Sequence, residues 1–181
     1  MRRLLLVVLI AAAGAAPAYA QSRDYRDGAT FGGGLGIGSI SCEGADCGSV
    51  NSAGGLMLHL GAMVAPDVAI LGDAWGMLRR DDSATFSQGM LMGAVRFWPV
   101  QRLWLGAGIG VARAEWKYDV GSVQFQSRTA WVPAGMLNLG VEVVSQRDFS
   151  LDVELRGGIG FYDQNDVQVR NVLLGVGINF F

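Results

Sequence analysis

The sequence has few of the residues that keep a soluble domain in solution. Only 17% of its 181 residues are charged, whereas 51% are hydrophobic. Lys117 is the only lysine and His59 is the only histidine. A soluble domain normally exposes many lysines and glutamates, and a nucleic-acid-binding domain carries a basic patch. The composition therefore argues against an ordinary soluble domain and against a nucleic-acid partner.

Apolar runs long enough for a membrane helix are missing after the N-terminus. The first residues combine a basic start, an apolar run from Leu4 to Ala13, and the small-x-small segment Ala18-Tyr19-Ala20. These are the three parts of a secretory signal peptide, and the apolar run is too short to span a bilayer. We expect residues 1–20 to be a cleaved signal peptide and 21–181 to form one domain. An anchoring or amphipathic N-terminus that stays on the chain is the alternative.

Cysteine is scarce as well, with Cys42 and Cys47 as the only two. In an exported protein, two cysteines this close together predict a disulfide that closes a small loop. A zinc site would need further ligands of matching softness, and the sequence offers a single histidine. We therefore expect a Cys42–Cys47 disulfide, no metal site and no cofactor.

What the sequence does have is an alternation of apolar residues with glycine or polar residues, which is the period of a β-strand. The alternation is clearest in the last stretch, 171–181, whose apolar face carries Val172, Leu174, Val176, Ile178 and Phe180. Eight such strands are predicted, at 29–40, 53–64, 68–79, 88–98, 103–115, 128–144, 149–161 and 171–181.

The connections between these strands alternate in length. Long loops are expected at 41–52, 80–87, 116–127 and 162–170, and tight turns at 65–67, 99–102 and 145–148. Pairing the last strand with the first would close the sheet and leave no unpaired edge. The predicted fold is all-β, an eight-stranded antiparallel up-and-down transmembrane β-barrel with its apolar face toward lipid.

A soluble lipocalin-like barrel that carries an apolar ligand is the main alternative, since it would turn the same apolar face inward. The other face argues against it, because that face is mostly glycine and not lysine, serine or threonine. Aromatic residues near the strand ends also suit the two interfacial girdles of a membrane barrel. The expected girdle residues are Phe97, Trp98, Trp104 and Phe149 near the turns, and Trp116, Trp131 and Phe161 near the loops.

In this layout the chain resembles the small eight-stranded outer-membrane barrels of Gram-negative bacteria, the OmpA/OmpX-like superfamily with its generic outer-membrane β-barrel domain. The resemblance rests on the signal peptide, the glycine-alternating strand Phe31 to Gly38, the strand Leu103 to Val111, and Val172 to Phe181. It implies an outer-membrane location and contact with outer-membrane lipid.

In this superfamily, a terminal phenylalanine after apolar residues at every second position is read by the barrel-assembly machinery. The resemblance therefore implies that machinery as a partner and a C-terminal assembly signal made of Val172, Leu174, Val176, Ile178, Phe180 and Phe181. Here the apolar row runs through Phe180 and not Phe181. Either Phe180 faces lipid, or the end of the strand is bulged.

Polar residues on the inward faces predict a charged network inside the barrel. Registers set by the turns place His59 opposite Asp73, Glu142 near Asp152, and Asn138 near Arg156. The expected network consists of His59, Asp73, Arg96, Glu142, Asp152, Glu154 and Arg156. Buried charges must be paired, so we interpret the network as a plug. A His59–Asp73 catalytic dyad would need a serine positioned by the histidine, and a pH-sensitive or ion-conducting role is a further alternative.

We therefore expect no catalytic residues and no enzymatic activity. The predicted function is an envelope-structural or surface-interaction role, with a possible surface ligand bound through the loops. A lumen this narrow is too full of side chains for a solute channel, which favours these roles over transport. A narrow ion-conducting pore is the alternative function. The chain is expected to act as a monomer.

Overall fold

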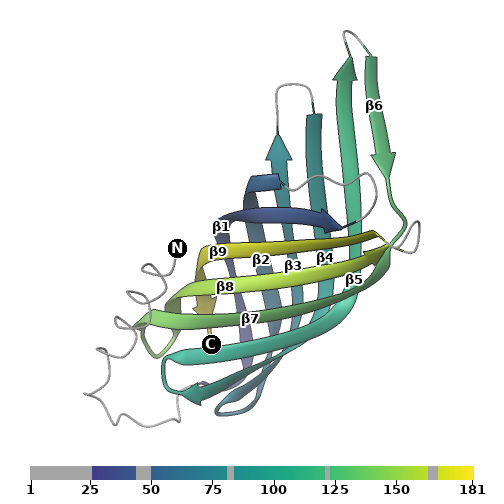
Figure 1. Ribbon diagram of the computed structural model, residues 1–181. Helices are drawn as coiled ribbons and strands as arrows, with labels where there is room; N and C mark the ends of the chain where they lie inside the picture. Colours follow the sequence, from purple (N-terminus) through teal and green to yellow (C-terminus); the bar gives the residue numbers. More distant parts are fainter. Residues whose placement is uncertain (1–25, 44–49, 81–83, 121–122, 163–166) are drawn as a thin grey trace.

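The computed structural model describes residues 26–43, 50–80, 84–120, 123–162 and 167–181. Figure 1 shows a barrel whose wall rises much higher on one side than on the other. The predicted signal peptide and Cys47 lie outside the described residues. Nowhere in the described ranges is there a helix long and apolar enough to cross a membrane.

The described elements are all β-strands, as the alternating pattern predicts. They are β1 (Ala29–Glu43), β2 (Val50–Ala65), β3 (Val68–Arg80), β4 (Ala84–Val100), β5 (Leu103–Val120), β6 (Val123–Arg128), β7 (Val132–Ser145), β8 (Phe149–Tyr162) and β9 (Val167–Phe180). All of their pairings are antiparallel.

The sheet closes because its first and last strands pair. β1 runs beside β9 from Phe31 opposite Phe180 to Glu43 opposite Gln168, and β4 pairs with β5. Both β6 and β7 pair with β5, at successive positions along it. The barrel wall therefore has eight strands in up-and-down order, with β6 as an extension beyond it, and the predicted fold class is confirmed.

The prediction of a loop at 116–127 was wrong. β5 continues through this stretch to Val120 and β6 returns beside it, with Trp116 opposite Ser127 and Tyr118 opposite Phe125. A strand that has left the membrane needs no apolar outer face, so it can continue through charged residues. β4 likewise begins at Ala84, inside the predicted loop 80–87.

Pro133 marks the place where the raised hairpin joins the barrel. The sequence predicts a bulge or a strand extending beyond the membrane at this proline, and the break between β6 and β7 lies at residues 129–131. Thr129 keeps this segment attached to β5, because its N–H donates to the Ala114 carbonyl (3.0 Å) and its hydroxyl accepts from the Ala114 N–H (3.0 Å). Three residues (129–131) lie opposite two on β5 (113–114), so the chain carries a bulge where it passes from β6 into β7.

The two faces of the wall differ as expected for a membrane barrel. Large apolar side chains point outward and are exposed, for example Ile109 at 79%, Ile37 at 73% and Leu137 at 70%. Charged residues such as Arg96, Asp73 and Arg156 are buried inside. A soluble lipocalin-like barrel would have the opposite arrangement, so the structure argues against that alternative.

Three of the expected girdle residues, Trp98, Trp104 and Trp116, face inward; Trp116 packs half-buried against Phe86, with ring centres 5.0 Å apart. Trp98 and Trp104 are 3% and 0% exposed and lie inside the barrel. They occupy inward positions of their strands, where each indole N–H finds a carboxylate. Phe97, Trp131 and Phe161 do lie on the outer surface, at 42%, 49% and 43% exposure.

The end of the last strand is regular. The pairings of β9 with β1 and with β8 show no register shift, so the alternative of a bulged end is wrong. The ring of Phe180 stacks on Phe31 at 5.0 Å and lies 6.5 Å from Phe149. Phe181 turns to the interior, where its ring meets Trp98 at 6.2 Å. Phe180 is therefore the lipid-facing residue.

Candidate functional site

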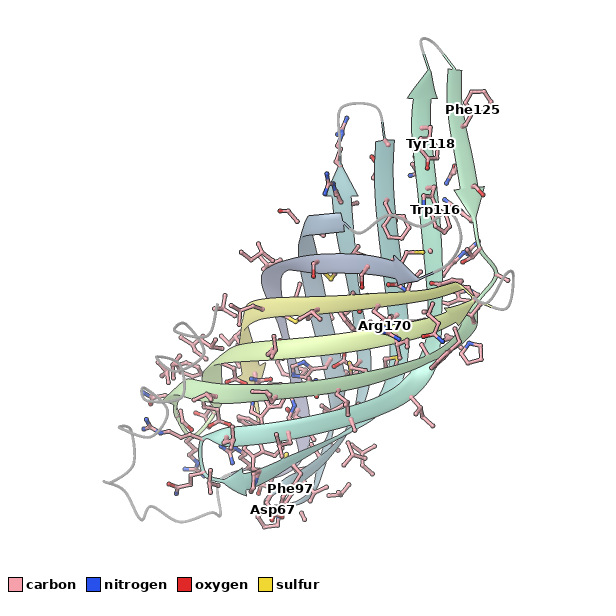
Figure 2. All side chains as sticks on the ribbon, in the orientation of Figure 1. Asp67, Phe97, Trp116, Tyr118, Phe125 and Arg170 are labelled. Atoms are coloured by element: carbon pink, nitrogen blue, oxygen red, sulfur yellow. The ribbon has the colours of Figure 1, made fainter. Side chains whose placement is uncertain are left out.

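Two regions carry side chains in arrangements that could serve a function. One is the interior of the barrel, and the other is the raised β5–β6 hairpin (Figure 2). We call the side of the barrel with the connections β2–β3, β4–β5 and β7–β8 the turn end, and the opposite side the loop end. The interior is described first, from the turn end upward.

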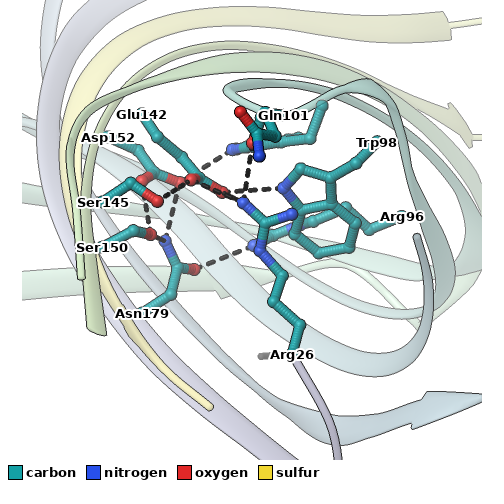
Figure 3. Close-up of polar contacts among 10 residues, drawn as sticks. Arg26, Arg96, Trp98, Gln101, Glu142, Ser145, Ser150, Asp152 and Asn179 are labelled. Carbon is teal, nitrogen blue, oxygen red and sulfur yellow. Dashed lines mark hydrogen bonds and ion pairs between the residues drawn. The ribbon is translucent and has the colours of Figure 1, made fainter. Parts of the chain in front are cut away.

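Arg26 closes the turn end of the interior (Figure 3). Its Nη2 donates to both carboxylate oxygens of Glu142 (2.7 and 2.6 Å) and to the Gln101 carbonyl (2.8 Å). The Trp98 indole N–H also donates to Glu142 (2.7 Å), and the Arg26 guanidinium lies 4.9 Å from the centre of the Trp98 ring and 5.4 Å from that of Phe181. Because a buried carboxylate is costly unless it is paired, Glu142 requires this set of donors.

A second cluster surrounds the carboxylate of Asp152. Donors to it are the Trp104 indole N–H (2.7 Å), the Ser150 hydroxyl (2.8 Å) and the Asn179 side-chain amide (2.6 Å). Arg96 donates to the other end of the Asn179 amide (2.8 Å), and its guanidinium lies 4.0 Å from the centre of the Trp104 ring. The cluster links β4, β5, β8 and β9 across the lumen.

Arg156 holds the third cluster. It donates to Asp73 through Nη1 and to Glu154 through Nη2 (3.3 Å), and its side chain is 1% exposed. His59 faces Asp73 across β2 and β3, as the turn predicts, but the Asp73 Oδ1 accepts from Arg156. The buried His59 Nε2 has no hydrogen-bond partner in the described part of the chain. This nitrogen therefore does not make the hydrogen bond that the alternative of a catalytic dyad would require.

The loop-end half of the lumen is filled differently. A layer of three side chains crosses it: the Gln88 amide donates to the Tyr162 hydroxyl (3.0 Å), and Asn171 donates to Gln88 (2.7 Å). Most of the remaining volume is apolar. Its larger buried side chains are Ile40, Met57, Trp75, Met77, Met90, Met92, Met136, Val169 and Leu173.

The strand registers predicted from the turns agree with the structure. His59 faces Asp73, Glu142 faces Asp152, and Asn138 faces Arg156. All seven residues of the expected network are buried, and the three clusters place Asp73, Arg96, Glu142, Asp152, Glu154 and Arg156 together inside the barrel. The second hairpin, β4–β5, also predicts Arg96 near Trp104, and the two are in contact. Sequence reasoning missed Arg26, which precedes β1, and the inward-facing partners Trp98, Ser150 and Asn179.

The raised hairpin presents aromatic rings on its inward face, above the barrel. Phe86 and Trp116 pack with their ring centres 5.0 Å apart, and Tyr118 and Phe125 face each other one step further from the barrel. Tyr118 and Phe125 are 49% and 58% exposed. Within the described ranges, β6 pairs with β5 only, so its other edge is unpaired. Exposed aromatic rings beside an open strand edge form a surface on which a partner could bind.

The outward face of the same hairpin is charged. Glu115 accepts from Lys117 (3.1 Å), Arg128 (3.0 Å) and Gln126. The hydrogen bond from Lys117, followed by those from Gln126 and Arg128, lowers the pKa of Glu115 from its ordinary value. The hairpin is thus held by an ion-pair cluster on one face and by aromatic packing on the other.

The predicted Cys42–Cys47 disulfide and the expected absence of a metal site both stay predictions. Cys42 packs half-buried against the apolar interior, but Cys47 lies outside the described residues, so the disulfide is untested. Across the ranges that the structure describes, three or more His, Cys, Asp or Glu side chains do not gather in a way that could hold a metal ion.

The barrel resembles several solved structures. These include Ail, the attachment invasion locus protein of Yersinia pestis (16% identity, TM-score 0.65, covering 85% of this chain and 99% of that one). Neisserial surface protein A has 15% identity and a TM-score of 0.57, covering 85% of this chain and 99% of that one. The N-terminal β-barrel domain of Pseudomonas aeruginosa OprF has 15% identity and a TM-score of 0.53, covering 86% of this chain and 99% of that one. No curated protein matches the sequence.

At these identities the solved structures show a shared fold and nothing finer. The family comparison covers nearly the whole sequence, since the model of the outer membrane protein beta-barrel domain matches residues 6–180. That match agrees with the closed eight-stranded wall, the outward apolar rows and the paired charges inside. The chain therefore belongs to the outer membrane protein beta-barrel domain family.

Proposed function

We propose that this protein is a non-enzymatic outer-membrane barrel that binds a partner protein at the cell surface through its raised β5–β6 hairpin. The observation that carries the proposal is the unpaired edge of β6 beside the exposed rings of Tyr118 and Phe125. An extended peptide can add to such an edge through backbone hydrogen bonds, while side-chain pockets or rings select its sequence. Aromatic residues are also enriched where protein surfaces bind partners.

The filled lumen supports a surface role over a transport role. Side chains occupy it from Arg26 at the turn end to the Gln88–Tyr162 layer at the loop end. An eight-stranded barrel is just wide enough for its side chains. Ail, which shares the fold, is described as an attachment invasion locus protein and has been crystallised with the heparin analogue sucrose octasulfate. A protein of this fold has thus been crystallised in complex with a ligand.

The test is binding of the folded protein, in detergent, to an array of random dodecamer peptides. We expect binding to peptides rich in β-branched and aromatic residues, lost in the double variant Tyr118→Ser/Phe125→Ser. Phe161→Ser is the matched control, because Phe161 is also an exposed aromatic residue near the loop end but lies on β8. Equal binding by all three proteins would contradict the proposal.

A narrow pore is the second candidate, because several buried polar atoms in the lumen have no partner among the described residues. They include His59 Nε2, Asp73 Oδ2, Arg96 Nε and Arg156 Nε. Such atoms are usually satisfied by internal water. A pore predicts single-channel conductance in a planar bilayer that changes in Arg96→Gln. The surface role predicts no single-channel conductance.

Export and assembly are part of the proposal. Residues 1–20 would be removed as a signal peptide, and the outward row of β9 from Val172 to Phe180 would be presented to the barrel-assembly machinery. Expression of Phe180→Ser in a Gram-negative host should lower the amount of folded protein in the outer membrane. Mass spectrometry of the exported wild type should find Gln21 as its first residue.

A further inference from the structure

A furrow crosses the outer wall of the barrel from β1 to the foot of the raised hairpin. It follows a row of residues that face each other across neighbouring strands, in the order Leu35, Leu56, Gly76, Gly89 and Arg113. Its volume is about 850 Å³. The furrow exists because the outward positions in this row on β3 and β4 are both glycine, whereas large apolar side chains stand on either side.

The banks of the furrow are apolar apart from Ser87 and, at the loop end, Glu115. Leu58 and Leu91 line one bank, and Leu78 lines the other together with Ser87 and Gly54. At Gly54 and Gly89 an added Cβ would meet nothing within 4 Å, so the space in front of the strands is open. The furrow lies among the exposed apolar residues that face lipid.

The dimensions of the furrow suit a lipid chain. The open floor over Gly76 and Gly89 lies between Leu56 and Arg113, three steps between strands at about 4.8 Å each, or roughly 14 Å. The hydrocarbon of one leaflet is about 15 Å thick, half of a core of about 30 Å. Barrel strands tilt by about 35–45°, so a row at right angles to them also runs obliquely through the leaflet. An acyl chain could therefore lie along the furrow for most of its length.

The loop-end terminus of the furrow is lined by Arg113, Trp131 and Glu115. Arg113 lies there beside Trp131, with its guanidinium 5.8 Å from the ring centre and its Nε donating to the Thr129 carbonyl (3.1 Å). Lys117 and Arg128 follow on the same outward face, and they share the single carboxylate of Glu115. In the described part of this face the cations thus outnumber the anions. Arginine binds phosphate through paired hydrogen bonds, and tryptophan is enriched at the membrane interface.

We propose that the furrow is a binding site for one phosphorylated membrane lipid. An acyl chain lies along Gly76 and Gly89, and the phosphate is bound by Arg113 with the positive field of Lys117 and Arg128. A second copy of the barrel fits this surface less well, because two copies would bring the same cations together. The site uses the outward face of the hairpin, so it does not depend on the surface partner proposed above for the inward face.

The test is native mass spectrometry of the folded protein in a zwitterionic detergent. The probes are dipalmitoyl phosphatidylglycerol and dipalmitoyl phosphatidylcholine, added in equal amounts. We expect the protein to retain one phosphatidylglycerol in preference to phosphatidylcholine. Arg113→Gln should weaken that retention about tenfold, because it removes hydrogen bonds to a charged group. Gly89→Leu should weaken it by filling the furrow, while leaving Arg113 in place.

Two matched variants serve as controls. Gly93→Leu makes the same change on the same outward face of β4 but outside the furrow, where an added Cβ would meet only the Ile109 carbonyl, at 3.9 Å. Arg102→Gln makes the same charge change at the turn end. Both should retain the lipid as the wild type does. Folding is checked by the change of gel mobility on boiling, and Gly54→Leu replaces Gly89→Leu if the latter does not fold.

Three outcomes would overturn the proposal. One is equal retention of the two lipids by the wild type. Another is an equal loss in Gly93→Leu and Gly89→Leu, which would show that the furrow has no special part. The third is a dimer of the chain in place of a lipid adduct, which would make this face an interface between copies.

Discussion

The turn-end and loop-end halves of the lumen fill the same narrow cylinder with different chemistry. The turn-end half holds three arginines, Arg26, Arg96 and Arg156, against four buried carboxylates. The loop-end half holds methionines and small apolar residues around one uncharged hydrogen-bonded layer, Gln88–Tyr162–Asn171. Interior charges require specific partners at specific positions, whereas methionine adapts to irregular space. The turn-end half should therefore determine which strand registers are tolerated, and the loop-end half should tolerate substitution.

The largest effect is expected when the turn-end network loses its central cation. Arg156→Met removes the partner of both Asp73 and Glu154 and leaves two buried carboxylates without it. Breaking a buried ion pair from one side costs about 3–5 kcal/mol. Urea unfolding in detergent micelles, followed by tryptophan fluorescence, measures the loss in the free energy of unfolding.

The matched control lies in the loop-end half. Met77→Leu changes a side chain that is just as buried, at 2% exposure, but uncharged. A volume-conserving apolar exchange costs less than about 1.5 kcal/mol. If the two variants lost the same stability, the contrast between a specific half and an adaptable half would be wrong.

Two glycines sharpen the same contrast on a smaller scale. A Cβ at Gly140 would lie 2.3 Å from the Trp104 ring, and one at Gly55 would lie 2.3 Å from a Leu173 methyl group. Trp104 cannot move without breaking its hydrogen bond to Asp152, whereas the end of a leucine side chain can shift. Gly140→Ala should therefore lower the free energy of unfolding by about 1–3 kcal/mol, as overpacking does, and Gly55→Ala by less. The same urea titration compares them, and a larger loss in Gly55→Ala would contradict this account.

The features that could be predicted from the sequence are those that follow the strand period. The strand period gave the barrel, the two faces and the registers, including His59 opposite Asp73, because a period of two leaves few choices once the turns are placed. It could not give Arg26, which precedes the first strand in a segment without a period. Trp98 and Trp104 were predictable, since they alternate with the outward residues Phe97 and Leu105. Their places in the alternation indicate the inward face, whereas aromatic residues near strand ends are also typical of the interfacial girdles.

The β5–β6 hairpin was missed because its signal is weaker than that of the membrane strands. Its alternation is between aromatic and charged residues, Trp116 and Tyr118 against Glu115 and Lys117, and not between apolar residues and glycine. Above the membrane both faces meet water, so neither needs to be uniformly apolar. The hydrogen bonds between the strands and the ion pairs of Glu115 keep the hairpin formed where lipid does not.

The smallest expected effect concerns this exposed ion-pair cluster, which contrasts with the buried pairs of the turn end. The pKa of Glu115 is lowered chiefly by the hydrogen bond from Lys117. A carboxylate with a lowered pKa in the folded state adds stability that is present above the unfolded value, about 4.3 for glutamate, and is lost as the pH falls through the folded value. Carbon NMR of labelled glutamate, assigned with Glu115→Gln, should give a titration midpoint below the ordinary one. Lys117→Gln should raise that midpoint, and amide exchange in β6 should speed up as the pH falls through it. A midpoint unchanged in Lys117→Gln would mean that Lys117 does not stabilise the ionised form of Glu115.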